Sequence, residues 1–468
     1  MTARPQARPV TAAPSPAAAP APRRGVLTDW RPEDPEFWAA GGARIARRNL
    51  VQSVLTEHIG FSVWSLWSVL VLFLGPSYGI DAAGKFTLTA LPTALGAGLR
   101  LPYTAAVARF GGRTWTVVSA LLLLIPLVAA GLVLRPGVSY GTLLAVACLA
   151  GVGGGNFASS MANVNAFYPQ RLKGWALGVN AGGGNLGVAG VQLVGLLALA
   201  TAGAAHPRLL PLVYLPLVVL AAAGAALRMD DLAPALRRPA DGGRPLREVL
   251  GEPHTWALSV LYIGSFGSFI GFGFAFGQVL QVQFHQQFDT PVKAACLTFL
   301  GPLTGSLTRP LGGRWADRVG GGRVTLAVFA AMAAATGLVL GASATGSLPL
   351  FITAFVLLFA LSGIGNGSVS AMVPAVFRAR AAEAVAAGVA EPEAAVSTAR
   401  ARSAAVIGLM GAIGAFGGVL VNLAFRQSFL SGSDGIPAYT GFLAAYAVCA
   451  ALTWGVYLRR GPRRLPAV

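Results

Sequence analysis

The sequence predicts an all-α membrane protein with twelve transmembrane helices in two pseudo-symmetric six-helix halves. Hydrophobic residues make up 55% of the 468 residues and charged residues only 11%, whereas soluble domains carry about 25% charged residues. Apolar runs of about twenty residues, the length that crosses a hydrocarbon core, recur along the chain. Two related motifs, one in each half, also place an arginine inside an apolar run.

The apolar runs form two groups of six, separated by a charged linker rich in proline and glycine at residues 228–252. We therefore expect an N-terminal half over residues 50–227 and a C-terminal half over residues 253–468. The expected spans lie near residues 50–75, 84–106, 114–134, 140–163, 174–199, 208–227, 255–279, 291–311, 322–342, 347–376, 402–424 and 438–458.

The first 49 residues form no span of their own. Residues 1–25 are rich in proline and alanine, and we expect a disordered tail. Residues 30–50 (WRPEDPEFWAAGGARIARRNL) combine tryptophan, acids and a basic end. Such a segment is typical of the membrane surface.

The distribution of lysine and arginine predicts the orientation. With the N-terminus inside, 28 of the 35 basic residues fall on the cytoplasmic side, where membrane proteins concentrate them. We therefore expect a multi-pass protein of the cell (inner) membrane with both termini in the cytoplasm. The net charge of +18 reflects this bias, and nucleic acid is not an expected partner. The outer loops would hold Lys85, Arg135, Arg208, Lys293 and Arg426.

The two repeated motifs each place one arginine deep in a span. Arg100 precedes Arg109 by nine residues, and Arg309 precedes Arg318 by the same number. Nine helical residues rise about 13 Å, which is near the middle of a hydrocarbon core roughly 30 Å thick. A charge at that depth is costly and usually functional.

A second pair of motifs relates the two halves. Residues 151–155 (GVGGG) match residues 363–367 (GIGNG). Internal repeats of this kind are typical of transporters that bind their substrate between the halves, near the midplane of the membrane.

Residues 313–322 (GRWADRVGGG) resemble the loop motif of the major facilitator superfamily, although Ala108 replaces the acid in the first half. Residues 178–192 (GVNAGGGNLGVAGVQ) resemble the nitrate signature of the nitrate/nitrite porter (NarK/NasA) family. Residues 167–174 and 262–269 are similar to that family too. The resemblance implies transport of nitrate and nitrite.

The same resemblance implies a binding site. Arg100 and Arg309 would clamp the anion from either side. Nitrate and nitrite are planar, and a guanidinium group is a planar, permanently charged fork of donors. The implied neutral and aromatic lining is Tyr262, Asn180, Asn185, Phe157 and Phe266. The two asparagines could instead form hydrogen bonds between helices, and the tyrosine could instead anchor its span at the membrane interface.

The charged residues of the two loop motifs are expected to serve a different purpose. They lie at the predicted cytoplasmic ends of the spans, where ion pairs between spans can form a gate. The expected gate residues are Arg109, Arg314, Asp317 and Arg318.

Acidic residues are expected to stay out of the site. All seventeen lie in tails, loops or near span ends, and the deepest is Glu57, near the inner end of the first span. Nothing would then neutralise Arg100 and Arg309 except the substrate, because unpaired buried charges are costly. An empty carrier would return with difficulty, so we expect antiport of nitrate against nitrite.

A nitrate/proton symporter is the alternative. Glu57 and His58 could carry the proton, since histidine titrates near neutral pH. The favoured interpretation is an interfacial pair that anchors the first span beside Arg44, Arg47 and Arg48. An organophosphate/phosphate exchanger also uses paired arginines, but its larger substrate needs more polar lining.

Other classes of protein find no support in the sequence. A proton-coupled drug or sugar carrier would need buried acids. A membrane enzyme would need a nucleophile with its base or a metal cluster, but the four histidines are scattered and the three cysteines are isolated. We expect no catalytic residue, metal or cofactor, and a monomer that acts on nitrate and nitrite in the lipid bilayer.

Overall fold

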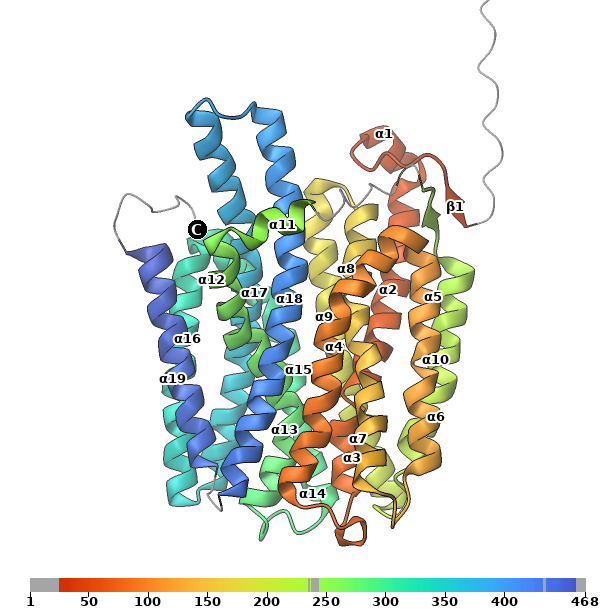
Figure 1. Ribbon diagram of the computed structural model, residues 1–468, viewed down its shortest axis with the longest axis vertical. Coiled ribbons are helices and arrows are strands. Elements are labelled where there is room, and N and C mark those ends of the chain that lie inside the picture. Colours follow the sequence, from red (N-terminus) through yellow and green to blue (C-terminus); the bar gives the residue numbers. More distant parts are fainter. Residues whose placement is uncertain (1–24, 235, 237–243, 432–434, 460–468) are drawn as a thin grey trace, which may run out of the picture.

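The computed structural model describes residues 25–234, 236, 244–431 and 435–459, and these residues are almost entirely helical. The expected disordered tail falls on residues 1–25, of which all but Gly25 lie outside the described residues. The helices run side by side along one common direction (Figure 1). The prediction of an all-α membrane protein is confirmed.

The first group of helices begins at the membrane-proximal N-terminal segment and ends before the linker. Several spans consist of two successive helices. The elements are β1 (Val26–Leu27), α1 (Pro35–Phe37), η1 (Trp38–Gly42), α2 (Ala43–Trp64), α3 (Leu66–Phe73), η2 (Pro76–Tyr78), α4 (Ala82–Phe110), α5 (Gly112–Leu122), α6 (Leu124–Val133), α7 (Tyr140–Leu149), η3 (Ala150–Gly155), α8 (Asn156–Phe167), α9 (Gln170–Ala202) and α10 (Leu209–Arg228).

The second group follows the linker and repeats the plan. Its first span is interrupted by a π-helical turn, η4. The elements are β2 (Asp231–Leu232), α11 (Arg244–Leu250), α12 (Pro253–Tyr262), η4 (Ile263–Gly267), α13 (Ser268–Gln283), α14 (Pro291–Thr298), α15 (Leu300–Val319), α16 (Gly321–Thr345), α17 (Leu348–Ala386), α18 (Pro392–Leu430), α19 (Ile436–Thr453) and η5 (Trp454–Leu458).

Ten helical segments of the described chain are long and apolar enough to cross a membrane. The helices α4 and α14–α15 are not among them, yet they stand beside the others in the bundle (Figure 1). These two carry Arg100 and Arg309. With them the described helices form the twelve expected spans.

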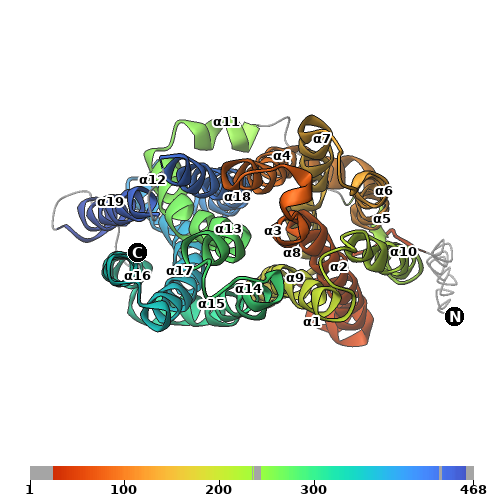
Figure 2. The same cartoon turned by 90° about the horizontal axis from the view of Figure 1, so that it is seen from below.

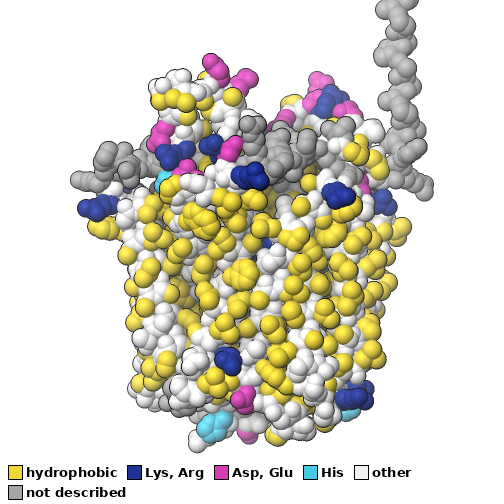
Figure 3. Space-filling model, in the orientation of Figure 1, with side chains coloured by type: hydrophobic (Ala, Val, Ile, Leu, Met, Phe, Trp, Pro, Cys, Tyr) yellow, Lys and Arg dark blue, Asp and Glu magenta, His cyan; other side chains and the backbone are white. Residues whose placement is uncertain are grey.

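The outer surface of the bundle is suited to lipid. Figure 3 shows hydrophobic side chains over the middle of the visible face, whereas charged side chains gather toward its two ends. Large apolar side chains are exposed on the outside of the helices, among them Leu132, Leu197 and Leu220, which are each more than 60% exposed. An apolar belt of this kind replaces water with hydrocarbon around the helices.

The repeated motif ends its helix in the same way in both halves. Gly111 has φ 99° where α4 ends, and Gly320 has φ 93° where α15 ends. Side chains rarely adopt such positive φ values, so glycine is required there. The second glycine of each motif then starts the next helix.

The two groups of helices meet along a seam. Helix α4 packs on α18, α9 packs on α14 and α15, and α3 packs on α13. Figure 2, a view along the bundle, shows α4 beside α18 on one side and α9 beside α14 on the other. Several hydrogen bonds cross the seam, including Gln192 Nε2 to the Gly273 carbonyl at 2.8 Å and Thr89 Oγ1 to Asn422 Oδ1 at 2.7 Å.

The linker is attached to both groups at one end of the bundle. Strand β1 pairs in parallel with β2, and Asp230 accepts hydrogen bonds from Arg48 and Asn49. On the other side, Glu248 of α11 pairs with Arg402 of α18 at 3.1 Å. Beyond this end, α17 and α18 project as a helical hairpin (Figure 1).

Candidate substrate-binding site

Arg100 of α4 is completely buried between the two groups of helices. Its guanidinium carbon lies 4.6 Å from the ring centre of Phe157 and 4.9 Å from that of Phe266. Its Nη1 donates a 2.8 Å hydrogen bond to the Gly411 carbonyl of α18, across the seam. Among the described residues, its Nε and Nη2 atoms have no hydrogen-bond partner.

Arg309 of α15 occupies the corresponding place in the second group and is 8% exposed. Its Nη2 donates to the Tyr262 hydroxyl over 3.4 Å, which is long for a hydrogen bond. Its Nη1 has no partner in the described part of the chain. Each half thus places a buried guanidinium group at the site, with at least one hydrogen-bond donor that has no partner in the described chain.

Three aromatic rings stack beside the arginines. The Tyr262 and Phe266 rings lie 5.2 Å apart and almost parallel, and Phe266 faces Phe157 at 6.2 Å with planes 30° apart. A flat ion held between two rings needs about 7 Å, twice the usual contact distance of about 3.5 Å. In this conformation the Phe157–Phe266 gap is therefore slightly too narrow, and the rings would separate to admit an ion.

Glu57 of α2 corrects the expected absence of acids. Its side chain is buried, and its Oε2 accepts hydrogen bonds from Ser160 Oγ and, at 2.5 Å, from Asn180 Nδ2. Ser160 lies three residues from Phe157, whose ring contacts Arg100, so the carboxyl group shares the interior of the arginine site. The expectation that every acid lies in a tail, in a loop or near a span end is wrong for Glu57, whereas the expectation that substrate alone balances the two arginines stays a prediction.

The physical reason is the length of α2. The apolar run begins near residue 50, but the helix begins at Ala43. Glu57 therefore lies fourteen residues along the helix, or about 21 Å from its start. The interpretation of Glu57 as an interfacial anchor beside Arg44, Arg47 and Arg48 is wrong for this residue.

His58 does not share the environment of Glu57. Its Nδ1 lies 3.2 Å from the Gly183 carbonyl of α9, and the side chain is half-buried. The adjacent positions on α2 thus face different parts of α9. Gly184 leaves the room that the Glu57 carboxylate fills, because a Cβ there would overlap it.

The two asparagines of α9 differ. Asn180 donates to Glu57 and, at 2.8 Å, to Ser160 Oγ, so it belongs to the carboxylate network. Asn185 is buried, and neither of its amide atoms has a partner among the described residues. Direct contact of either residue with an anion stays a prediction.

The four expected gate residues lie on the exposed ends of α4 and α15. The cation of Arg109 lies 5.5 Å from the centre of the Phe110 ring. In the part of the chain that the structure describes, Asp317 forms no ion pair with Arg314 or Arg318. Their role as a gate stays a prediction.

Several residues at the site gave no clear signal in the sequence. Gly411 contributes only a backbone carbonyl, which any residue type could supply. Ser160 and Trp64 are ordinary span residues; the Trp64 ring lies 5.7 Å from the Arg100 cation. Asn366 is a different case: the repeated GIGNG motif pointed to its region, and it is fully buried with both amide atoms unpartnered among the described residues.

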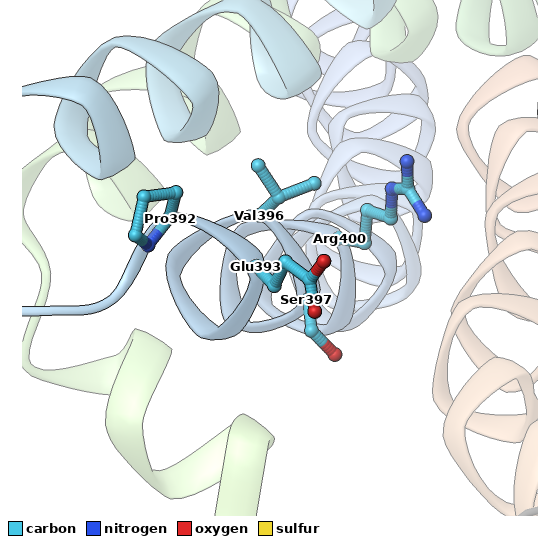
Figure 4. Close-up of a pocket in the computed structure, with 5 residues that line it drawn as sticks. All are labelled: Pro392, Glu393, Val396, Ser397 and Arg400. Carbon is cyan, nitrogen blue, oxygen red and sulfur yellow. The ribbon is translucent and has the colours of Figure 1, made fainter. Parts of the chain in front are cut away.

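A surface depression elsewhere is a poor candidate. It is lined by five side chains on the first turns of α18 (Figure 4). All five belong to one helix of the projecting hairpin, so the depression is not between the two groups of helices. They are Pro392, Glu393, Val396, Ser397 and Arg400.

Comparison with known protein families shows which family the chain belongs to. Residues 58–421 match the family model described as Major Facilitator Superfamily. The chain belongs to this superfamily. Within it, the chain belongs to the nitrate/nitrite porter family, because it is 38% identical to the nitrate/nitrite transporter NarU of Salmonella typhimurium over 94% of the chain and 98% of that protein.

Two further relatives and two solved structures agree with this placement. NarU of Escherichia coli is 38% identical over 93% of the chain and 97% of its own length. The probable nitrate/nitrite antiporter NarK2 of Thermus thermophilus is 31% identical, with 94% and 98% covered. As major facilitator folds, the nucleoside transporter NupG matches with a TM-score of 0.60 at 14% identity, covering 88% of this chain and 100% of its own. A bacterial homologue of the lysosomal transporter Spinster matches at 0.61 and 16%, with 88% and 98% covered.

Proposed function

We propose that this protein is a transmembrane transporter of nitrate and nitrite that works by alternating access, with the anion clamped between Arg100 and Arg309. The observation that carries the proposal is the pair of buried guanidinium groups, one from each half, with unpartnered donors. Relatives named as nitrate/nitrite transporters support the choice of substrate.

The spare donors suit a small oxyanion. Arg100 offers Nε and Nη2, and Arg309 offers Nη1. A buried donor without a partner costs about 1–3 kcal/mol, and more when it is charged. A planar anion between the halves would accept from all three atoms and would remove that cost, whereas a neutral solute would leave the charges unbalanced.

Exchange is the transport mode that this clamp supports directly. One monovalent anion leaves as another enters, so the charge of the loaded site never changes. A one-for-one exchange of like charges also moves no net charge across the membrane potential. Nitrate entering against nitrite leaving is the pairing that we propose.

The packing of the two halves offers a path for the motion. The seams α4–α18 and α9–α15 join the halves, so rotation about these contacts would expose the arginines to one side and then to the other. We place the end with α1, α11 and the hairpin in the cytoplasm, with both termini there, because the loops at that end carry most of the basic residues. A monomer in the inner membrane is sufficient for this cycle.

Purified protein in liposomes tests the proposal. Isotope-labelled nitrate should enter nitrite-loaded vesicles, and Arg100→Lys or Arg309→Lys should abolish entry, because lysine keeps the charge but loses the planar fork. Arg135→Lys in an expected outer loop is the matched control and should transport normally. Wild-type vesicles that accumulate no label, or arginine variants that exchange as fast as wild type, would contradict the proposal.

A further inference from the structure

The interior that holds the two arginines also holds a third ionisable group. Glu57 from α2 is buried there, and its hydrogen-bond partner Ser160 lies three residues from Phe157, whose ring contacts Arg100. Glu57 forms no direct ion pair with either arginine among the described residues. Instead, neutral donors from Ser160 and Asn180 hold one of its oxygens.

The second carboxylate oxygen is free. Glu57 Oε1 is buried and has no hydrogen-bond partner within the described chain. An ionised carboxylate normally accepts bonds at both oxygens, so a bare one in an interior is costly. The same oxygen can bind a proton without breaking the contacts of Oε2.

We propose that Glu57 is the proton-carrying group of the transport site, so that the protein moves one proton with each anion in net uptake and exchanges anions without moving protons. This inference rests on the proposed function, because it needs an anion at the arginine pair. The proton would bind at Oε1 as the anion binds, and would leave from the same atom when the anion has been released.

The charges of the cycle balance. With Glu57 ionised and no anion bound, the three groups carry one net positive charge. A bound anion together with a proton on Glu57 restores the same single positive charge. The empty carrier and the fully loaded carrier therefore cross the cycle with equal charge, and anion plus proton move as a neutral pair.

Electrostatic repulsion provides the coupling. A second negative charge near an ionised carboxylate in a poorly solvated interior disfavours both charges together. Anion binding between the arginines therefore favours the protonated carboxyl, and loss of the proton favours release of the anion.

No other described titratable group competes closely with Glu57 for this role. The charged groups that act on the carboxylate are Arg309 from α15 and Arg100 from α4. Helices α8 and α9 present neutral Ser160 and Asn180. His58 on the same helix is engaged with the Gly183 carbonyl.

Glutamine at this position separates the two transport modes. The Glu57→Gln side chain is neutral and of similar shape, so it imitates the protonated form. The loaded carrier should still cross and exchange labelled nitrate for nitrite. Net uptake should fall by about tenfold or more, because the empty carrier must then return with two unbalanced buried cations.

The experiment uses wild-type protein and three variants in liposomes that contain a pH-sensitive dye. An inward nitrate gradient, with no internal anion that the carrier accepts, should acidify the wild-type interior by one proton per nitrate. Glu57→Asp keeps a carboxylate and should retain proton-coupled uptake. Glu391→Gln removes an exposed acid at the start of α18 and should behave as wild type.

Several outcomes would overturn the inference. Wild-type net uptake without proton movement would do so while leaving the proposed exchange intact. Proton-coupled uptake by Glu57→Gln would do so, and so would loss of its exchange in a variant that still binds nitrate. If Glu57→Gln does not fold, the proton stoichiometry of the wild type and of Glu57→Asp decides the matter. Failure of the wild type to exchange nitrate for nitrite would instead refute the proposed function.

Discussion

The two arginines come from matching motifs but occupy different surroundings. Arg100 is completely buried, lies against the Phe157 and Phe266 rings, and donates across the seam to the carbonyl of Gly411. Arg309 keeps some exposure and has one long bond to Tyr262 of its own half. Arg100 is therefore fixed to the opposite half, whereas Arg309 is held loosely.

The first spans of the halves differ in the same sense. In the N-terminal half, α2 brings a carboxylate toward the arginines through Glu57. In the C-terminal half, α12 brings the neutral Tyr262 hydroxyl. The halves therefore resemble each other in their arginines, whereas the first span adds a carboxyl group in one half and a neutral hydroxyl in the other.

Replacing each arginine by lysine gives the largest expected effect. Loss of a buried, hydrogen-bonded charge contact costs about 2–5 kcal/mol, so nitrate affinity should fall by about 30-fold or more for either variant. The loss should be greater for Arg100→Lys, because one ammonium group cannot replace the bond to Gly411, the ring contacts and the bonds to the anion. Equilibrium nitrate binding to purified protein measures both. Equal losses would show that the two surroundings are equivalent.

The aromatic faces around Arg100 are the next test. A cation over an aromatic face contributes about 0.5–2 kcal/mol, and Phe157 also narrows the slot for a flat ion. We expect Phe157→Leu to weaken nitrate binding by about tenfold. Phe416→Leu changes an exposed phenylalanine of α18 and is the control. Unchanged affinity in Phe157→Leu would mean that the ring serves packing alone.

The sequence predicted the paired arginines because both motifs repeat, and Tyr262, Phe157 and Phe266 through a family resemblance. The structure brings all five together. The sequence could not predict the depth of Glu57, because the first turns of α2 are polar and a search for apolar runs does not detect where this helix starts. The Gly411 carbonyl was also beyond reach, since a backbone acceptor depends on helix packing rather than on residue type.

The two asparagines of α9 allow a comparison between a residue of the carboxylate network, Asn180, and a residue without hydrogen-bond partners in the described chain, Asn185. Asn180→Ala removes a donor to the Glu57 carboxylate, and a hydrogen bond to a charged group contributes about 1.5–3 kcal/mol. We expect about tenfold slower net nitrate uptake, the transport mode in which Glu57 must ionise in the empty carrier. Asn185→Ala should slow net nitrate uptake by less than about threefold, because the Asn185 amide makes no hydrogen bond within the described chain that the substitution could remove. A larger loss at Asn185, measured in the same vesicles, would indicate direct contact with the ion.

The attachments of the linker repeat the contrast between the halves at a smaller scale. On the N-terminal side, Asp230 is buried and accepts from Arg48 and Asn49. On the C-terminal side, the ion pair of Glu248 with Arg402 is about 40% exposed at both partners. Burial should make the first attachment the stronger one.

Asp230→Ala should lower the free energy of unfolding by about 2 kcal/mol, because Asn49 and the half-exposed Arg48 both lose an acceptor. Glu248→Gln should change it by less than about 0.5 kcal/mol, since exposed ion pairs are screened by water and salt. Denaturant unfolding in detergent, compared at low and high salt, measures both. Equal destabilisation of the two variants would contradict this expectation, because the exposed ion pair on the C-terminal side would then contribute as much as the buried contacts of Asp230. The asymmetry of the halves would in that case be confined to the arginine site.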